Sequence, residues 1–398
     1  MTPRRILIFS LVYYPNFVAG AEVAIKEVTN RITSKEIEFD MITLRFDRNL
    51  PKCEKIGNVN VYRIGWSTIR KVSPDSLPWY LHLNKYFFLV FGTLKALSLN
   101  RKRHYDATWS LMATYNSFAA VFFKILKPKI KFIFTLQDGD PIDYLKRRAL
   151  PLYPFFKMMF IKADQIQAIS KYLADWAKEM GAKCPITVIP NAVDYELFSR
   201  KDDPLVLTKL ANDMGKKSGD VFLITTSRLV VKNAVIDIVK SMQYLPSNVK
   251  LLILGQGYEE ENLKLEARKL KPGSDSNSRV KFLGYVPHAE MVKYLQISDI
   301  FIRPSLSEGL GISFLEAMAS GIPVIATPVG GIPDFLRDGE TGLFCEVGNP
   351  KSIAQKVEKL IKDRESREYI VRQAKEMVEE KYTWEKITGE MKKIFNNQ

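Results

Sequence analysis

Cysteine and histidine are scarce in this chain of 398 residues, which contains three of each. They are Cys53, Cys184 and Cys345, and His82, His104 and His288. The cysteines are far apart and odd in number, so we expect neither a disulfide framework nor a zinc motif. The histidines are equally scattered, which argues against a histidine-based metal site. Thiols without partners are typical of a reducing compartment, and we therefore expect a cytoplasmic protein.

Long hydrophobic runs are also missing, because no uninterrupted stretch approaches the roughly 20 apolar residues of a membrane-spanning helix. The first residues, MTPRRILIFSLVYYPNFVAGAE, resemble a secretory signal in their two arginines, their apolar stretch and the small residues 19–21. Residues 13–16, Tyr-Tyr-Pro-Asn, interrupt that stretch. We therefore interpret residues 4–10 as a first buried strand.

Acidic residues are few in the first half of the chain. Residues 1–195 contain 29 Lys and Arg against 16 Asp and Glu, a net charge of +13, whereas the remainder contains 30 against 28. Such an excess suggests a nucleic-acid-binding protein as one alternative. A protein of that kind should interleave stacking aromatics with its basic residues. Here the aromatics lie mainly in apolar runs such as KYFFLVF and YPFFKMMF, which disfavours that alternative.

Strand-like apolar runs alternate with helical patterns along the whole chain, which is typical of parallel α/β architecture. The predicted strands are 4–10, 39–46, 107–111, 131–136, 165–170 and 186–190, then 220–229, 249–255, 279–286, 298–304 and 322–328. The length favours two domains. We predict an N-terminal Rossmann-like domain over residues 1–198 and a second one over 199–382. A terminal helix, about 383–398, should cross back onto the first domain.

The stretch PSLSEGLGISFLEAMASGIPVIAT (304–327) contains two isolated acids, Glu308 and Glu316. Glu308 follows a predicted strand and stands beside glycines that allow close approach of a ligand. The helix that follows offers a phosphate its N-terminal N–H groups. Glu316 lies about 12 Å farther along that helix. An alternative is structural: Ser313 and Glu316 match a capping box, Gly321 ends the helix, and Glu308 is a solvated loop acid.

This stretch resembles the signature of the retaining glycosyltransferases of family 4, in which two glutamates flank a glycine-containing turn. Five further segments match in the expected order: YYPNFVAGAE, VIPNAVD, SRLVVKN, GYVPHAEMVKYLQISDIFIRPS and YTWEKI. The family has the α/β fold called GT-B, in which two doubly wound Rossmann-like domains face each other across a central cleft. We expect that fold here.

The resemblance also implies roles for individual residues. Glu308 should hold hydroxyls of the donor sugar, with the amides of Gly309, Leu310 and Gly311 beside it. Arg228 and Lys232 should neutralise the diphosphate leaving group, and these two residues with Glu308 form the predicted catalytic set. Glu316 should bind the ribose hydroxyls, and Gly255, in a weak Gly-Gln-Gly turn, should approach the donor. On the acceptor side we expect Gly20, Gln137 and Asp138.

The chain departs from the family pattern at several of these positions. Lys232 comes one position early, and Asn233 stands where lysine is common. Alanine replaces glycine at Ala19, beside Gly20, and at Ala192. Gln137 occupies the place of a histidine that reaches toward the reacting sugar in many members. Glutamine forms hydrogen bonds but serves neither as acid nor as base.

Asp138-Gly-Asp140 resembles the metal-binding Asp-x-Asp of the other major glycosyltransferase fold. Its setting inside a doubly wound domain favours a loop-stabilising or acceptor-binding pair. We expect no metal and no cofactor, since the nucleotide-sugar is a co-substrate.

The resemblance therefore predicts a metal-independent, retaining hexosyltransferase that moves a sugar from a UDP- or GDP-sugar to a glycan or lipid-linked acceptor. Such an enzyme would form an α-glycosidic bond and act in cell-envelope glycan biosynthesis, with no nucleic-acid partner. Alternatives are a catalytically inactive glycan- or nucleotide-binding paralogue and a nucleotide-sugar epimerase of the same fold. A phosphorylase would need a lysine-bound pyridoxal phosphate, for which we find no motif.

Two basic clusters adjoin apolar-aromatic segments, at 77–105 and 144–162. Their cations are Arg101, Lys102 and Arg103, and Lys146, Arg147 and Arg148. Each cation near an anionic lipid surface contributes about 1 kcal/mol, which suggests a peripheral enzyme at the cytoplasmic face of the membrane. The alternative is that the aromatics Phe87, Phe88, Phe91, Phe155 and Phe156 are core residues with a solvated basic rim.

Overall fold

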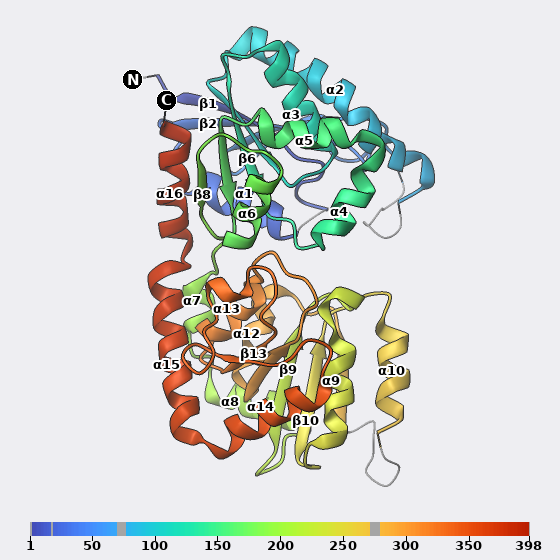
Figure 1. Cartoon of the computed structure of the whole chain (residues 1–398), viewed down its shortest axis with the longest axis vertical. Coiled ribbons are helices and arrows are strands. Elements are labelled where there is room, and N and C mark those ends of the chain that lie inside the picture. Colours follow the sequence, from blue (N-terminus) through green and yellow to red (C-terminus); the bar gives the residue numbers. More distant parts are fainter. Residues whose placement is uncertain (1, 17–18, 70–76, 271–278, 398) are drawn as a thin grey trace. The chain divides into compact units, whose positions relative to one another are not determined.

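The computed structural model of the chain describes residues 2–16, 19–69, 77–270 and 279–397. It divides into two compact units, one of Met1–Asn191 with Trp384–Gln398 and the other of Ala192–Thr383. Their elements are labelled in Figure 1. The division falls a few residues before the predicted boundary at 198, and the C-terminal helix is grouped with the first unit. The sequence also predicts a loop at residues 271–278, KPGSDSNS, which lie outside the described residues.

The first unit is built on one sheet with the order β3-β4-β2-β1-β5-β6-β7-β8. Its strands are β1 (Arg4–Phe9), β2 (Ile37–Leu44), β3 (Cys53–Ile56), β4 (Val59–Ile64), β5 (Ala107–Leu111), β6 (Lys131–Leu136), β7 (Gln165–Ala168) and β8 (Ile186–Val188). All pairs are parallel except β3 with β4. Residues 4–9 thus form a central strand, as predicted. The chain reverses its direction of winding between β1 and β5.

Helices cover both faces of this sheet. They are α1 (Gly20–Asn30), α2 (Trp79–Arg103), α3 (Tyr115–Leu126), α4 (Ile142–Ala149), the short helix η1 (Leu150–Leu152), α5 (Tyr153–Ile161), α6 (Lys171–Glu179) and α16 (Trp384–Asn396). Successive side chains of a strand point to opposite faces. Accordingly Phe9 of β1 meets Phe123 of α3, whereas Arg4 donates a hydrogen bond to the Phe395 carbonyl of α16. Phe395 also packs on Phe39 and Trp109, so α16 seals the second face.

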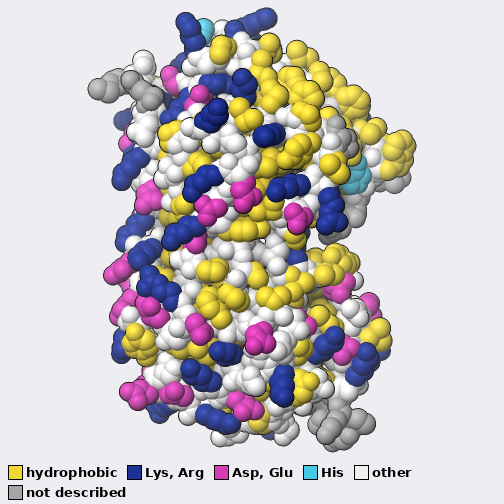
Figure 2. Space-filling view, viewed as in Figure 1, with side chains coloured by type: hydrophobic (Ala, Val, Ile, Leu, Met, Phe, Trp, Pro, Cys, Tyr) yellow, Lys and Arg dark blue, Asp and Glu magenta, His cyan; other side chains and the backbone are white. Residues whose placement is uncertain are grey.

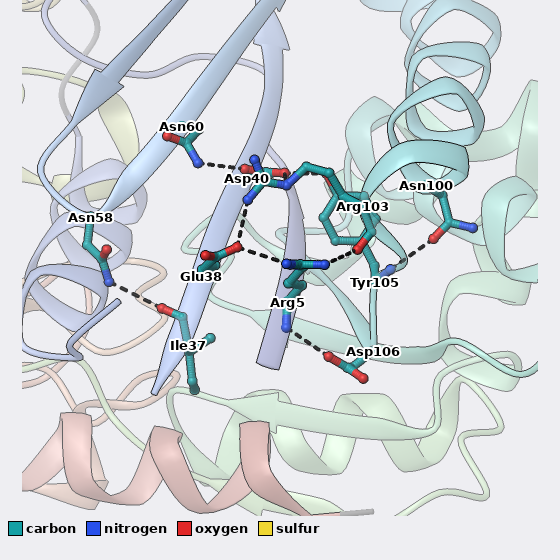
Figure 3. Close-up of polar contacts among 10 residues, drawn as sticks. All are labelled: Arg5, Ile37, Glu38, Asp40, Asn58, Asn60, Asn100, Arg103, Tyr105 and Asp106. Atoms are coloured by element: carbon teal, nitrogen blue, oxygen red, sulfur yellow. Dashed lines mark hydrogen bonds and ion pairs between the residues drawn. The ribbon is translucent and has the colours of Figure 1, made fainter. Parts of the chain in front are cut away.

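A partly buried ionic cluster fixes the C-terminal end of α2 to this sheet (Figure 3). Arg103 pairs with Glu38 at 2.7 Å and with the buried Asp40 at 2.9 Å. Arg5 joins Glu38 at 3.0 Å, and Tyr105 donates to Asp40. Arg103 is therefore held by two carboxylates of β2. This corrects the prediction that Arg103 belongs with Arg101 and Lys102 in a cluster facing lipid.

The second unit is built on an all-parallel sheet with the order β11-β10-β9-β12-β13-β14. Its strands are β9 (Val221–Thr226), β10 (Val249–Leu254), β11 (Val280–Gly284), β12 (Ile300–Arg303), β13 (Val324–Ala326) and β14 (Leu343–Phe344). Its helices are α7 (Tyr195–Ser199), α8 (Pro204–Asp213), η2 (Val231–Asn233), α9 (Val235–Ser241), η3 (Met242–Tyr244), α10 (Glu260–Arg268), α12 (His288–Gln296), α13 (Ile312–Ala319), η4 (Ile332–Asp334), α14 (Pro350–Lys362) and α15 (Arg364–Lys381).

The core of this unit follows from strand alternation. Leu223, Ile300 and Ile302 belong to one buried cluster with residues of α9, α10 and α14. Phe301, on the other face of β12, packs against Phe314 of α13 with ring centroids 5.7 Å apart. The order of winding reverses between β9 and β12, and ligands of doubly wound sheets bind at such a switch point. The loops after these two strands therefore form the candidate ligand site.

Three strands were missing from the predicted set: the β3–β4 hairpin and β14. Alternate residues of β4 are buried and half-buried, and β3 pairs only with β4 at the edge. Neither strand is a continuous apolar run, and β14 has two residues. A pattern of continuous apolar residues therefore does not predict these three strands. They form strands because they pair with a neighbouring strand in the folded protein.

Candidate functional site

Two loops meet at the carboxyl ends of β9 and β12. The loop after β9 contains Arg228 and Lys232, and the loop after β12 contains Glu308. The strands are neighbours in the sheet, with Leu223 opposite Ile300. Beyond them the loops are joined directly, since the Leu306 N–H donates to the Lys232 carbonyl at 2.7 Å. The structure thus brings together the three residues of the predicted catalytic set.

The Glu308 carboxylate is held on two sides. One oxygen pairs with the Arg303 guanidinium, and the other accepts a hydrogen bond from the Gly309 N–H at 3.0 Å. The side chains of Arg303 and Glu308 are only 11% and 13% exposed. A charge pair this deep holds its geometry when further hydrogen bonds satisfy it. Glu308 is therefore not the solvated loop acid of the alternative interpretation.

Arg303, at the end of β12, is the centre of this network. Its guanidinium donates to Ser313 Oγ at 2.8 Å and to Asn233 Oδ1 at 3.1 Å, in addition to Glu308. It also lies over the Phe314 ring, 5.3 Å from the centroid. Arg303 thus connects both loops to the start of α13. The sequence does not indicate this role, because an arginine at a strand end carries no signal of its own.

Asn233 is a second residue whose structural role the sequence does not indicate. It is 3% exposed, and its amide nitrogen donates to the Arg228 carbonyl at 2.7 Å while its oxygen accepts from Arg303. Asn233 therefore fixes the loop that carries the exposed Arg228 and the half-buried Lys232. Because Asn233 is buried and hydrogen-bonded here, Lys232 is the residue of this loop that supplies the expected lysine.

Glycines allow the loops to pack against one another. A Cβ on Gly255, whose φ is +133°, would lie 1.8 Å from the Ser227 carbonyl oxygen. A Cβ on Gly330 would lie 1.9 Å from the Glu308 carbonyl oxygen, which accepts from the Gly331 N–H at 3.1 Å. The close approach at Gly255 is thus between backbones. The backbone of Glu308 is fixed by Gly330 and Gly331. The sequence alone does not indicate this role.

The turn Gly309-Leu310-Gly311 leads directly into α13. Leu310 is 2% exposed, and Gly311 is the N-cap at φ +93°. As a glycine, Gly311 has no side chain to cap this helix. Its first N–H groups and the partial positive charge of the helix end are therefore directed at the space beside Glu308, where an anion is favoured.

Glu316 lies on α13, with its side chain 8% exposed. Because the helix begins at Ile312 with Gly311 as N-cap, Ser313 is not the N-cap and the capping-box alternative is wrong. One carboxylate oxygen of Glu316 lies 2.7 Å from Nε2 of His288, the first residue of α12. This hydrogen bond raises the pKa of His288. Gly321 follows the helix at φ +77°, as predicted for its end.

The predicted acceptor-side residues lie in the first unit. Gly20 begins α1, and the Ala19 N–H donates to the buried Glu22 at 2.9 Å. Gln137 follows β6, and its oxygen accepts from Asn191 at 3.2 Å. Asp138 is 2% exposed and accepts from the Ala113 N–H at 3.1 Å, which fits a loop-stabilising residue. Burial raises the pKa of Asp138 to about 6.

The second unit therefore combines two cations and the Glu308 carboxylate in neighbouring loops with the N-terminus of α13 and the Glu316 carboxylate on that helix. Cations and N–H groups suit a phosphorylated ligand, and carboxylates suit sugar hydroxyls. In the described part of the chain, no three histidine, cysteine or acidic side chains converge as a metal site would require.

Comparison with known proteins agrees with this chemistry. Residues 208–377 match the family described as "Glycosyl transferases group 1", and residues 18–197 match "Glycosyltransferase Family 4". An uncharacterized glycosyltransferase of Methanocaldococcus jannaschii is 25% identical over 389 residues, covering 96% of this chain and 95% of that protein. A capsular polysaccharide biosynthesis glycosyltransferase of Staphylococcus aureus is 31% identical over 262 residues, covering 62% and 64%.

Solved structures show the same fold. Sucrose-phosphate synthase from Thermosynechococcus elongatus superposes with a TM-score of 0.80 at 17% identity, covering 98% of both chains. HepE of Anabaena, in complex with UDP-glucose, superposes with a TM-score of 0.76 at 16% identity, again covering 98% of both. At these identities the likeness concerns the fold alone, two Rossmann-like α/β domains of the GT-B type. With both halves matched by its models, the chain belongs to the group 1, family 4 glycosyltransferases.

Proposed function

We propose that this glycosyltransferase transfers a sugar from a UDP- or GDP-sugar to a glycan or lipid-linked acceptor, with retention, forming an α-glycosidic bond. Glu308 binds hydroxyls of the donor sugar, and the N–H groups of residues 309–311 face the donor. Arg228 and Lys232 stabilise the diphosphate as it leaves. Glu316 binds the ribose.

The hydrogen bond between the two loops, from Leu306 to Lys232, carries this proposal. It brings the diphosphate cations and the sugar-binding carboxylate to one place, the carboxyl ends of β9 and β12. Breaking the glycosidic bond moves negative charge onto the diphosphate. Fixed cations and helix N–H groups stabilise this charge more in the transition state than in the ground state, which is what accelerates the reaction.

The named relatives support a role in cell-envelope glycan synthesis. The relative from S. aureus acts in capsular polysaccharide biosynthesis, and the Anabaena structure contains UDP-glucose.

Gln137 suits a binding role. Its amide nitrogen is buried and has no partner among the described residues, so it is available to a hydroxyl. Retention would then proceed without a side-chain base at this position.

A panel of UDP- and GDP-sugars tests the proposal. We expect slow hydrolysis of one donor, faster release of the nucleotide once the right acceptor is added, and an α-linked product by proton NMR. An epimerase would instead yield an isomerised sugar with no dependence on acceptor. A paralogue without activity would bind a nucleotide and leave every donor intact, and either result contradicts the proposal.

Activity should survive excess EDTA. Asp138 is buried and already accepts a backbone hydrogen bond, so this proposal gives the Asp138–Asp140 pair no catalytic ion to hold. The check is the initial rate of donor turnover with and without EDTA. Loss of activity that manganese or magnesium restores would show that the enzyme is metal-dependent.

Nucleotide affinity should rise between pH 6 and pH 8. The raised pKa of His288 means that its imidazolium persists above the ordinary value of about 6.5. The imidazolium occupies one Glu316 oxygen that a ribose diol would use, and deprotonation weakens that competition. The measurement is the Kd for UDP or GDP against pH, with His288→Asn as the control that should remove the dependence. An affinity that falls as pH rises would mean that His288 assists ribose binding.

A further inference from the structure

The long helix α2 is apolar on both of its sides. One side packs inward through Leu81, Asn84, Phe88, Gly92, Ala96 and Leu99. The opposite side carries Trp79, Leu83, Tyr86, Phe87, Val90, Phe91 and Leu94, each between 37% and 77% exposed. The inward side follows helical spacing, as an amphipathic helix should. The outward side is as hydrophobic as the inward one, whereas a surface helix normally presents polar residues to water.

This outward side continues onto neighbouring elements. Trp66, in the loop after β4, is 48% exposed and packs on Phe87 with ring centroids 5.4 Å apart. The buried Asn84 fixes it there, accepting from the Trp66 N–H and donating to its carbonyl. Figure 2 shows hydrophobic side chains gathered over the position of α2 in Figure 1. Single exposed apolar residues are ordinary, but a contiguous group of this kind marks an interaction site.

The charge around this surface is predominantly positive. Residues 77–137 contain nine Lys and Arg and a single acid, Asp106, and no acid occurs in α2, α3 or α5. Arg101 and Lys102 are exposed in the last turn of α2, and within the described residues no acidic side chain pairs with either. Burial and the nearby charge of Arg148 lower the pKa of Lys85, so the basic turn of α4 also lies near α2.

Of the five aromatics considered in the sequence analysis, two are core and three are not. Phe88 and Phe156 are 0% and 3% exposed, whereas Phe87, Phe91 and Phe155 are 40% or more exposed. The alternative that all five are core residues is therefore wrong. No described helix has the length and apolarity to cross a bilayer, so this surface would contact a membrane only from one side.

We propose that this apolar-basic face, made of Trp66, Trp79, Tyr86, Phe87, Val90, Phe91 and Leu94 with Arg101 and Lys102, docks the enzyme on the surface of a bilayer that contains anionic lipid. Aromatic and aliphatic side chains enter the headgroup region while the cations remain over the lipid charges. A second copy of the chain is a poorer occupant, because like charges would meet across the interface. The proposal stands on this surface alone and does not depend on glycosyl transfer.

Tryptophan fluorescence reports this docking directly. Trp66 and Trp79 are exposed and lie in the apolar-basic face, whereas Trp109, Trp176 and Trp384 are at most 3% exposed. These are all five tryptophans of the chain. Titration with phosphatidylcholine vesicles containing phosphatidylglycerol should shift the emission to shorter wavelength, and brominated acyl chains should quench it. Trp66→Phe/Trp79→Phe should lose the signal while the protein still sediments with the vesicles.

Sedimentation with matched variants completes the test. Arg101→Ser/Lys102→Ser should weaken binding to the anionic vesicles by about 30-fold, and Phe87→Ser/Phe91→Ser by at least about tenfold. The control is Leu205→Ser/Val206→Ser with Lys209→Ser, on α8 of the other unit, where Leu205 and Val206 are 79% and 44% exposed. It should bind as the wild type does, and binding should fall with added salt.

Several results would overturn the proposal. They are equal binding to phosphatidylcholine alone, binding of the wild type without an emission shift, unchanged binding of Arg101→Ser/Lys102→Ser and Phe87→Ser/Phe91→Ser, or equal loss in the control. A concentration-dependent shift without vesicles would assign the surface to self-association instead. Because none of these measurements involves turnover, their failure is distinct from failure of the proposed transferase activity.

Discussion

Arg228→Ala should lower the turnover number about 10²- to 10³-fold and change the donor KM much less. Removing one preorganised charge that stabilises the transition state typically has an effect of this size. Arg228 is exposed near the start of the loop after β9, and its side chain has no partner among the described residues, so the folded state should lose little. Steady-state kinetics on the donor identified by the panel are the measurement.

Lys232→Ala should also lower the turnover number and change the donor KM much less. Asn233→Ala is the variant with which it is compared. Asn233 stands where lysine is common in the family, but its buried hydrogen bonds to Arg228 and Arg303 give it a structural role. We expect Asn233→Ala to lower the melting temperature as well as activity, and Lys232→Ala to lower activity alone. A variant of Lys232 with wild-type turnover would remove this lysine from the catalytic set.

Arg303→Met should lower the free energy of unfolding by about 3–5 kcal/mol, the second large effect. Breaking a buried ion pair leaves the remaining charge without a partner in a medium that solvates it poorly. In this variant Glu308, with its side chain 13% exposed, would keep only the hydrogen bond from Gly309. Urea denaturation measures the loss.

A double-mutant cycle separates this effect from simple loss of packing. Arg303→Met/Glu308→Gln should recover part of the stability, because no unpaired carboxylate remains. Ser313→Ala, which removes only one of the arginine's hydrogen bonds, should cost about 1 kcal/mol. If the double variant is no more stable than Arg303→Met, the ion pair is not what stabilises this loop.

Periodicity and strand ends predict that the candidate site residues of the second unit lie at one edge of its sheet, and the structure has Arg228 and Glu308 in the loops after the neighbouring strands β9 and β12. Glu308 and Arg228 both follow apolar runs, and parallel strands place such positions at one edge of a sheet. The sequence pattern does not show which side chains form hydrogen bonds or ion pairs with one another. The pairing of Arg303 with Glu308 and of His288 with Glu316 depends on the orientation of separate elements, and spacing along the chain carries no information about it.

The two incorrect alternatives, the capping box and the aromatics that are all core residues, have similar causes. The spacing of Ser313 and Glu316 fits a capping box, but Gly311 adopts a positive φ and starts the helix earlier. The aromatic run Phe87-Phe88 looks uniform in sequence, yet one ring points outward and its neighbour inward. A helix that is apolar on all sides gives no periodic signal, so only the packed structure separates the core aromatics from those of the apolar-basic face.

Calorimetric titration of the wild type and Glu316→Ala with UDP and GDP tests the central claim most directly. If the loops of β9 and β12 form a nucleotide-sugar site, one of the two nucleotides binds the wild type with one-to-one stoichiometry. Glu316→Ala then weakens that binding by the roughly 1.5–3 kcal/mol of hydrogen bonds to a charged group, with the fold intact. Equal affinity in the two proteins, or no binding of either nucleotide to the wild type, would contradict the account.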